Sequence, residues 1–171
     1  RPPRLAIGTE EERTLRAGLV DALGVRLGRA VTPTSDQAAA MDALRADLGG
    51  EEPMLRLLQG DVGSGKTLVA AYGLALAAIA GHQGALLAPT DLLARQHAAT
   101  LGDLLAPLGL PVTLLTGSLS GAGTAKSLAT IADGSARVVV GTHALLQDRV
   151  AFPRLALAVI DEQHRFGVGQ R

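Results

Sequence analysis

The stretch Leu55-Arg-Leu-Leu-Gln-Gly-Asp-Val-Gly-Ser-Gly-Lys-Thr67 decides the fold. It follows the pattern G-x-x-x-x-G-K-[ST], between an apolar strand-like run and an apolar helical run. Its glycines allow successive backbone N–H groups to converge on an anion, and the start of the next helix adds a positive dipole. We expect Lys66 to reach the terminal phosphates of a nucleoside triphosphate and the Thr67 hydroxyl to ligate Mg²⁺. The predicted phosphate-binding loop comprises Gly60, Asp61, Val62, Gly63, Ser64, Gly65, Lys66 and Thr67.

The composition is that of a globular domain. Of the 171 residues 47% are hydrophobic and 19% charged, and the net charge is zero. A stand-alone nucleic-acid binder usually has a basic surface, so this class is not favoured. The aromatic residues are Tyr72, Phe152 and Phe166, too few for a base-stacking platform, so any nucleic-acid contact should involve phosphates. The absence of cysteine excludes disulfides and fits a cytoplasmic location.

Residues 1–31 are expected to form a helical linker or appendage from an upstream region. Thr9-Glu-Glu-Glu12 has the spacing of a capping box with Thr9 as the N-cap. An apolar stripe follows at helical spacing and needs a partner surface (Leu15, Leu19 and Leu23). Gly24 is the predicted end of this helix. The chain begins with Arg1, and we expect both of its ends to continue in a longer protein.

A second capping box, Thr34-Ser-Asp-Gln37, predicts a helix that ends at Gly49-Gly50. Gln37 has two possible roles. It can close the helix cap, or, just upstream of a phosphate loop, its amide can recognise the edge of an adenine base. The sequence leaves both open.

From residue 54 onward, short apolar runs alternate with helical segments. The predicted strands are 54–59, 85–88, 112–115, 137–140 and 155–160, and the predicted helices are 66–80, 91–105, 122–133 and 143–147. Strands that are apolar on both faces and separated by helices indicate a parallel sheet covered on both sides. Ligands of such α/β sheets bind beyond the carboxyl ends of the strands.

Two carboxylates follow the last predicted strand. Leu155-Ala-Leu-Ala-Val-Ile160 runs into Asp161 and Glu162. If this strand lies in the same sheet as the phosphate loop, Asp161 can reach the Mg²⁺ and Glu162 can polarise the attacking water. The metal would arrive with the triphosphate, since nothing in the sequence suggests a dedicated metal cage.

Other strand ends carry small polar residues and glycines: Ala88-Pro-Thr-Asp91, Thr116-Gly-Ser118 and Gly141-Thr-His143. Each is an ordinary cap or turn, and each also suits binding of a sugar-phosphate backbone. Among the histidines, we interpret His82 and His97 as surface or helix-face residues. His143 and His164 follow strands and are better candidates for sensing or relay.

These residues, in this order, resemble the motifs of the first motor domain of superfamily-2 helicases. Gln37 resembles the glutamine motif, Gly60–Thr67 motif I, Ala88–His97 motif Ia, Gly141–Ala144 motif Ib and Asp161–His164 motif II. More narrowly, the stretches 60–67, 140–147 and 161–168 resemble the RecG family of branched-DNA helicases. Transcription-repair coupling factors resemble the chain less, because they tend to have an aromatic residue in place of Ser64 and Glu in place of Gln163. The resemblance covers residues 32–171 well and residues 1–31 poorly.

The resemblance implies a RecA-like P-loop NTPase domain in residues 32–171, incomplete at its C-terminal end, with ATP and Mg²⁺ as cofactors. The intact protein would be an ATP-dependent DNA helicase or translocase that remodels stalled forks and Holliday junctions in recombination and repair. Lys66 and Glu162 would be catalytic, and Thr67 and Asp161 would hold the metal. Gln163 and His164 would couple hydrolysis to movement. The residues expected to touch the DNA backbone are Pro89, Thr90, Gly117, Gly141 and Thr142.

The same resemblance implies parts that this sequence does not contain: motif III, a second motor domain with an arginine finger, and a wedge domain that reads branched DNA. In the family the motif III strand lies between the strands of motifs I and II, so its loss would leave a gap in the sheet. Other chain segments, a second copy of the protein and local disorder all stay open as the way in which this gap is resolved. Without the finger, which can contribute about 10³–10⁵ in rate, we expect this chain to bind nucleotide at best.

Three other functions compete. One is a double-stranded DNA translocase of the coupling-factor type, and a second is a non-catalytic nucleotide-binding fragment. The third is a small-molecule kinase, which would lack the Asp161-Glu162 pair and would need an arginine-bearing lid.

Overall fold

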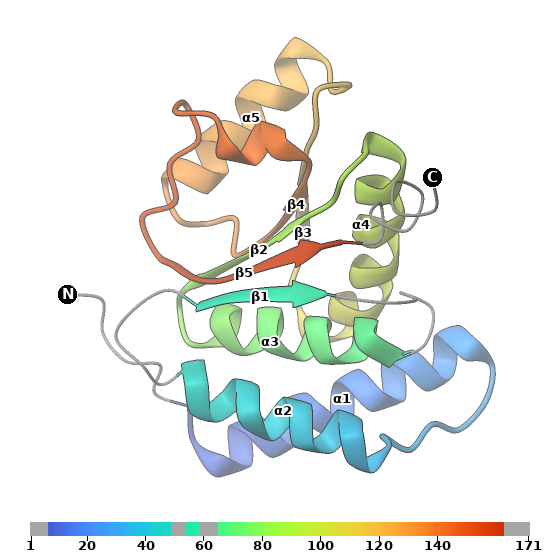
Figure 1. Ribbon diagram of the computed structural model, residues 1–171. Coiled ribbons are helices and arrows are strands. Elements are labelled where there is room, and N and C mark those ends of the chain that lie inside the picture. Colours follow the sequence, from blue (N-terminus) through green and yellow to red (C-terminus); the bar gives the residue numbers. More distant parts are fainter. Residues whose placement is uncertain (1–6, 49–53, 59–64, 163–171) are drawn as a thin grey trace.

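A computed structural model describes residues 7–48, 54–58 and 65–162 of the chain (Figure 1). Its helices are α1 (Thr9–Leu27), α2 (Ser35–Leu48), α3 (Thr67–Ile79), α4 (Asp91–Leu105) and α5 (Gly121–Ala132), with short 3-10 turns η2 (Ala106–Leu108) and η3 (His143–Leu146). Its strands are β1 (Met54–Leu58), β2 (Gln83–Leu87), β3 (Val112–Leu115), β4 (Val138–Gly141) and β5 (Leu155–Asp161). Within the described ranges, no helix is long and apolar enough to cross a membrane.

The five strands form one sheet in the order β1-β5-β2-β4-β3, and every neighbouring pair is parallel. The registers align the carboxyl ends of the strands. Leu58 of β1 pairs with Asp161 of β5, and Leu87 of β2 and Leu115 of β3 both pair with Gly141 of β4. The segments that follow the strands therefore emerge from one edge of the sheet, as predicted.

Side chains alternate between the two faces of the sheet, and both faces are covered. Leu86 and Val140 pack with α3 and α4, whereas Ala85, Val139 and Leu115 pack with Ile131 of α5. Figure 1 shows α3 and α5 on opposite sides of the strands. The predicted α/β fold, with a parallel sheet between helices, is confirmed.

The gap expected between the strands of motifs I and II is absent from the described sheet. β1 pairs directly with β5 over five successive residue pairs, from Met54↔Leu157 to Leu58↔Asp161. Direct pairing satisfies backbone N–H and C=O groups that a missing strand would leave without partners. The expectation of a gap was wrong for this chain.

Helices α1 and α2 form an outer layer on α3 (Figure 1). The apolar stripe of α1 is confirmed: Leu15 and Leu19 are buried in the same core cluster as α3 and α4. The helix that was predicted to form an appendage is therefore packed into the core. The domain boundary near residue 31 stays a prediction.

Two details predicted for α1 are wrong. The N-cap is Gly8, whose carbonyl accepts a hydrogen bond from Glu12 N, and no side chain caps the helix. The helix also continues through Gly24 and ends at Gly28, whose φ of 72° lies in the left-handed region that glycine adopts at little cost.

Glu12 is instead the centre of a buried polar cluster that joins α1 to α3 and α2. Its Oε1 accepts hydrogen bonds from the Tyr72 hydroxyl at 2.7 Å and from Arg16 Nε at 2.9 Å, and Oε2 lies 3.5 Å from Arg45 Nη1. The Arg16 guanidinium also lies over the Tyr72 ring, 5.0 Å from its centroid, and bonds Asp42.

This cluster changes the protonation equilibria of its members. Burial alone would raise the pKa of Glu12, but the hydrogen bonds from Tyr72 and Arg16 and the charges of Arg16 and Arg45 outweigh burial and lower it. Burial, together with the bond to Glu12, raises the pKa of Tyr72 to about 12. The ionised Glu12 and the neutral Tyr72 are therefore both favoured by the fold.

At the amino end of the sheet, the fully buried Gln83 joins three segments. Its Nε2 donates to the carbonyls of Ile131 at 3.0 Å and Ala136 at 2.9 Å, and its Oε1 accepts from Arg154 N at 3.0 Å. This side chain anchors the end of α5 against the sheet.

Candidate nucleotide site at the carboxyl edge of the sheet

The end of the predicted phosphate loop lies at the start of α3. Gly65 has φ +90°, a conformation that favours glycine, and Lys66 is the N-cap residue of α3. Thr67 is the first residue of α3, and its side chain is buried. The predicted phosphate-contacting residues Gly60, Asp61, Val62, Gly63 and Ser64 lie outside the described residues.

Gln37 forms the predicted cap and also contacts the phosphate loop. Its Oε1 accepts from Thr34 N at 2.8 Å, and Thr34 Oγ1 accepts from Gln37 N at 3.1 Å, which confirms the capping box. The Gln37 Nε2 donates to the Gly65 carbonyl at 3.1 Å. A Cβ on Gly65 would lie 1.9 Å from that nitrogen, so any other residue here would displace the Gln37 amide from this hydrogen bond. Recognition of adenine by Gln37 stays a prediction.

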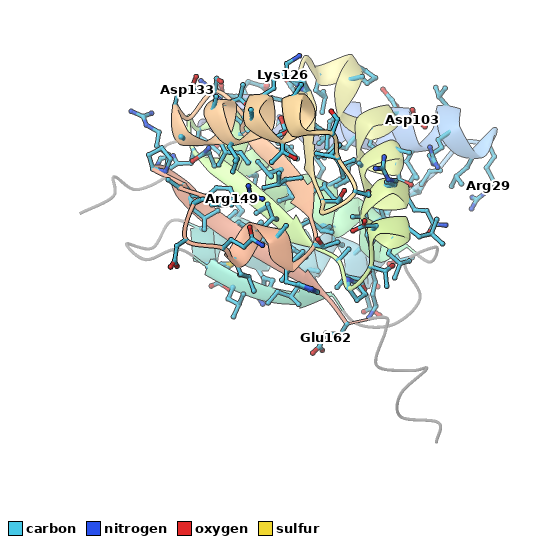
Figure 2. The ribbon with its side chains drawn as sticks, turned by 90° about the horizontal axis from the view of Figure 1, so that it is seen from above. Arg29, Asp103, Lys126, Asp133, Arg149 and Glu162 are labelled. Atoms are coloured by element: carbon cyan, nitrogen blue, oxygen red, sulfur yellow. The ribbon has the colours of Figure 1, made fainter. Side chains whose placement is uncertain are left out.

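The position of Asp161 follows from the alternation along β5. Leu157 and Val159 pack into the core beneath α3 and α4, so Asp161, two residues further, points to the same face. The side chain of Asp161 is buried, with 1% of its surface exposed, and Glu162 is buried just beyond it. Figure 2 shows Glu162 where β5 ends. The predicted coupling residues Gln163 and His164 lie outside the described residues.

His82 and His97 were interpreted from the sequence as surface or helix-face residues, and the surface interpretation is wrong for both, because both are buried. His97 does lie on a face of α4, but on the buried one. It is 4% exposed, and its Nε2 lies 2.7 Å from Asp161 Oδ2, a buried contact at hydrogen-bonding distance. The helical spacing contained a signal for this position, because His97 falls between the buried Ala94 and Leu101 on one face of α4. That its partner is Asp161 could be known only once α4 was placed over the carboxyl end of β5.

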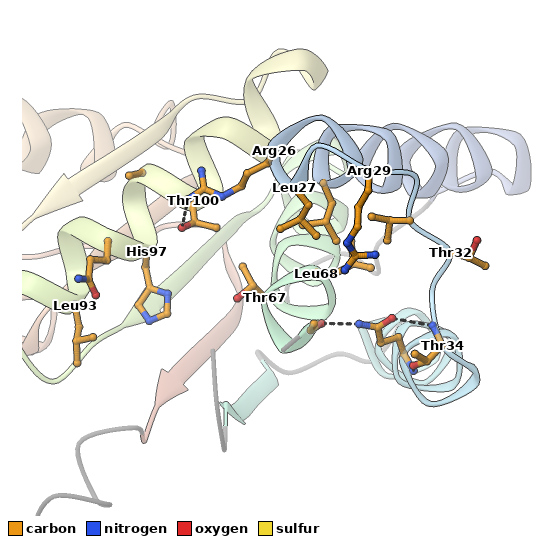
Figure 3. Close-up of a pocket in the computed structure, with 16 residues that line it drawn as sticks. Arg26, Leu27, Arg29, Thr32, Thr34, Thr67, Leu68, Leu93, His97 and Thr100 are labelled. Atoms are coloured by element: carbon orange, nitrogen blue, oxygen red, sulfur yellow. Dashed lines mark hydrogen bonds between the residues drawn. The ribbon is translucent and has the colours of Figure 1, made fainter. Parts of the chain in front are cut away.

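A cavity of about 770 Å³ opens beside this site (Figure 3). Its lining includes Gly65 and Thr67 at the start of α3, His97 of α4, and Gln37 and Arg29. Ligand pockets are typically about 300–1,000 Å³ and combine apolar walls with a few polar groups. The cavity therefore has room for the base and sugar of a nucleotide whose phosphates lie against the loop.

The donor atoms near the loop fit Mg²⁺ delivered with phosphates. Mg²⁺ takes oxygen ligands and commonly binds through one or two carboxylates, substrate phosphates and water. Thr67 offers a hydroxyl and Asp161 a carboxylate. Among the described residues there is no group of three or more His, Cys, Asp or Glu side chains that could hold a metal ion.

The residues predicted to contact DNA lie along the same edge, with different exposure. Thr90 and Gly117 are exposed, and Pro89 is half-buried. Thr90 also caps α4, accepting from Leu93 N at 3.2 Å. Gly141 and Thr142 are buried, and a Cβ on Gly141 would lie 2.3 Å from the Leu115 carbonyl oxygen. Their contacts with DNA stay predictions, and for Gly141 a need for close strand packing is independent of any ligand.

Comparison with known proteins identifies relatives of this chain. Residues 34–171 match the DEAD/DEAH box helicase family. The chain is 52% identical over 139 residues to the ATP-dependent DNA helicase RecG of Borreliella burgdorferi and 52% identical over 140 residues to that of Escherichia coli strain K12. Each alignment covers 81% of this chain and 20% of the relative, so the chain spans about a fifth of the length of these proteins.

Two solved helicase structures also superimpose on this chain. A structure of RecG bound to a three-way DNA junction superimposes with a TM-score of 0.71 at 34% identity, covering 91% of this chain and 24% of that one. A hypothetical ATP-dependent RNA helicase from Sulfolobus tokodaii superimposes with a TM-score of 0.63 at 21% identity, over 90% of this chain and 43% of that one, and shows the fold alone. The resemblance stated from the sequence motifs is confirmed, and the relatives favour RecG over the coupling factors.

Proposed function

Because the chain belongs to the DEAD/DEAH box helicase family, we propose that it is the nucleotide-binding part of the first motor domain of an ATP-driven translocase that remodels branched DNA. Stalled forks and Holliday junctions are the substrates that the similarity to RecG suggests. Such a protein would act in the cytoplasm, where the DNA is, together with a second motor domain and a wedge domain.

The pairing of Leu58 with Asp161 carries this proposal. Neighbouring strands lie about 4.8 Å apart, so the end of β1 lies beside the end of β5, where Asp161 and Glu162 follow. A phosphate-binding loop next to two buried acids is the arrangement that nucleoside-triphosphate hydrolysis requires, because positioning and charge stabilisation provide most of the rate.

Each residue then has a defined role. Lys66 would bind the terminal phosphates, Thr67 and Asp161 would hold Mg²⁺, and Glu162 would orient and polarise the attacking water. Bound Mg²⁺ would neutralise charge on the phosphate oxygens. Gln37 and the adjacent cavity would take the base and sugar.

The remaining residues would link the nucleotide to DNA. Gln163 and His164 would transmit the state of the nucleotide to the DNA-binding edge. Contacts of that edge with the sugar-phosphate backbone would be made by Pro89, Thr90, Gly117, Gly141 and Thr142. An arginine finger from the second motor domain would complete the transition-state charge stabilisation.

Nucleotide binding is tested by titrating a fluorescent ATP analogue into the chain, with Mg²⁺ and with EDTA. We expect Mg²⁺-dependent binding that Lys66→Ala weakens at least tenfold, because the ammonium group contacts the phosphates. Lys126→Ala is the matched control, since Lys126 is the second of the chain's lysines and lies exposed on α5, away from Glu162 (Figure 2). Equal affinities for both variants and the wild type would exclude the proposed site.

The role of Glu162 is tested by Glu162→Gln in a protein that also carries the second motor domain. ATP binding should remain while turnover falls by at least 100-fold, because an amide polarises water poorly. Unchanged turnover would assign the general-base role elsewhere.

A further inference from the structure

Helix α4 connects three parts of the molecule. Its N-cap Thr90 lies on the edge proposed to contact the DNA backbone. Two turns further, His97 contacts Asp161, and beyond it Thr100 and Asp103 bond to Arg26 of α1. Seven residues of α-helix span about 10 Å, so one rigid segment joins the DNA-facing edge to the acid proposed to hold the metal.

From this geometry we propose that His97 is a positioning residue: it orients the Asp161 carboxylate toward the nucleotide-bound metal ion and ties that carboxylate to α4. The inference rests on the proposed function and assigns a role to a residue that lies in none of the predicted catalytic, metal or DNA-contacting sets.

The contact has the properties that positioning needs. Nε2 of His97 lies 2.7 Å from Oδ2 of Asp161, and both side chains are at least 96% buried, so solvent cannot replace either partner. Because the imidazole contacts Oδ2, the direction of Oδ1 is fixed as well. Outer partners that hydrogen-bond a metal-ligating carboxylate typically change metal affinity 10–100-fold when they are removed.

His97 also borders the cavity, as Thr67 does (Figure 3). One side chain therefore contacts the acid at the end of β5 and faces the space proposed for the nucleotide. Displacement of α4 would move the ring and, through it, the carboxylate.

The test separates positioning from stability with two variants at one position. His97→Leu keeps an apolar volume and removes the ring nitrogens, whereas His97→Gln offers an amide nitrogen near the place of Nε2. His82→Leu is the control, because His82 is also buried but contacts the Ala80 carbonyl oxygen (Nδ1 to O, 3.2 Å) at the start of β2. Dissociation constants of a fluorescent ATP analogue are measured with Mg²⁺ and with EDTA, alongside thermal unfolding.

We expect His97→Leu to raise the dissociation constant at least tenfold with Mg²⁺ and less than about twofold with EDTA. His97→Gln should recover most of the Mg²⁺-dependent affinity, and His82→Leu should change neither constant even where it lowers the melting temperature. With Mn²⁺-ATP, the imidazole NMR signals of His97 should broaden more than those of His82.

Three results would overturn the proposal: equal losses with and without Mg²⁺, no loss for His97→Leu, or unfolding of both His97 variants, which would make the pair a purely structural one. If the wild-type chain itself shows no Mg²⁺-dependent binding, the proposed function fails and this role with it. Normal wild-type binding that His97→Leu leaves unchanged refutes the positioning role alone.

Discussion

Replacing Glu12 with Gln should lower the free energy of unfolding by about 2–3 kcal/mol, because this carboxylate joins α1 to α3. Glu12 accepts from the Tyr72 hydroxyl and from Arg16. A hydrogen bond to a charged group contributes about 1.5–3 kcal/mol, and Gln keeps one acceptor oxygen and a similar volume. Removing one partner of a fully buried ion pair costs about 3–5 kcal/mol, but the Arg16 side chain is 23% exposed and retains Asp42, so the loss is smaller.

Thermal and urea unfolding measure this loss. For a chain of this length each kcal/mol lowers the melting temperature by about 2–4 °C, so we expect a decrease of about 4–12 °C. Far-UV circular dichroism follows the whole fold. Tyrosine fluorescence follows this cluster in particular, because Tyr72 is the single tyrosine and the chain has no tryptophan.

The loss should also depend on pH in a definite direction. The pKa of Glu12 is lowered in the folded state, so the ionised carboxylate stabilises the fold above the ordinary carboxyl pKa, near 4.5. This stabilisation disappears as the pH falls through the lowered value. The difference between wild type and Glu12→Gln should therefore be full at pH 7 and shrink below about pH 4.

Glu11→Gln is the control, since Glu11 is the neighbouring residue on α1, is exposed, and loses the same charge. It should change the stability by less than about 0.5 kcal/mol. Equal effects of the two substitutions, or a Glu12 effect that persists undiminished at pH 3, would refute the reasoning.

Tyr72→Phe should cost about 1–2 kcal/mol in urea unfolding by circular dichroism, and the cost should vanish as the pH rises from about 10 to about 12, because the raised pKa stabilises the fold only while the phenol is neutral. Gln83→Glu should cost more than about 3 kcal/mol, because a carboxylate would face the two carbonyls that the amide now bonds; a smaller loss would mean that water reaches this position. Gly141→Ala should cost about 1–3 kcal/mol, since its Cβ would meet the Leu115 carbonyl, whereas Gly102→Ala in α4 has open space and should gain about 0.5–1 kcal/mol; the opposite order in melting temperature would contradict both.

The individual helices and strands were predictable because the sequence patterns that indicate them lie within each element. Apolar runs on both faces predicted the five strands, and α4 occupies the predicted residues 91–105. The capping box of Gln37 was also readable, since its two hydrogen bonds lie within four residues.

Contacts between distant segments were not predictable in the same way. The spacing of Thr9 and Glu12 suggested a cap, but the burial of Glu12 against Tyr72, 60 residues away, gives this acid another role. Likewise, the sequence placed Asp161 at a strand end, while its partner His97 depends on how α4 crosses the sheet. Chain order also does not determine which strands are neighbours, so the pairing of β1 with β5 could not be derived from it.

All strands of the sheet run in the same direction, so each connecting segment either follows a strand at the carboxyl edge or precedes one at the amino edge. These two classes should differ in their tolerance of insertions and deletions. One residue added within β5 would turn the position of Asp161 from the α4 side to the α5 side, because successive strand residues face opposite ways. Lengthening the turn at Gly134 and Ser135, which precedes β4 on the other edge, would leave every strand register unchanged. As far as strand register decides, natural length variation in this lineage should therefore collect where the strands begin, provided that the bonds of Gln83 to Ile131 and Ala136 are kept.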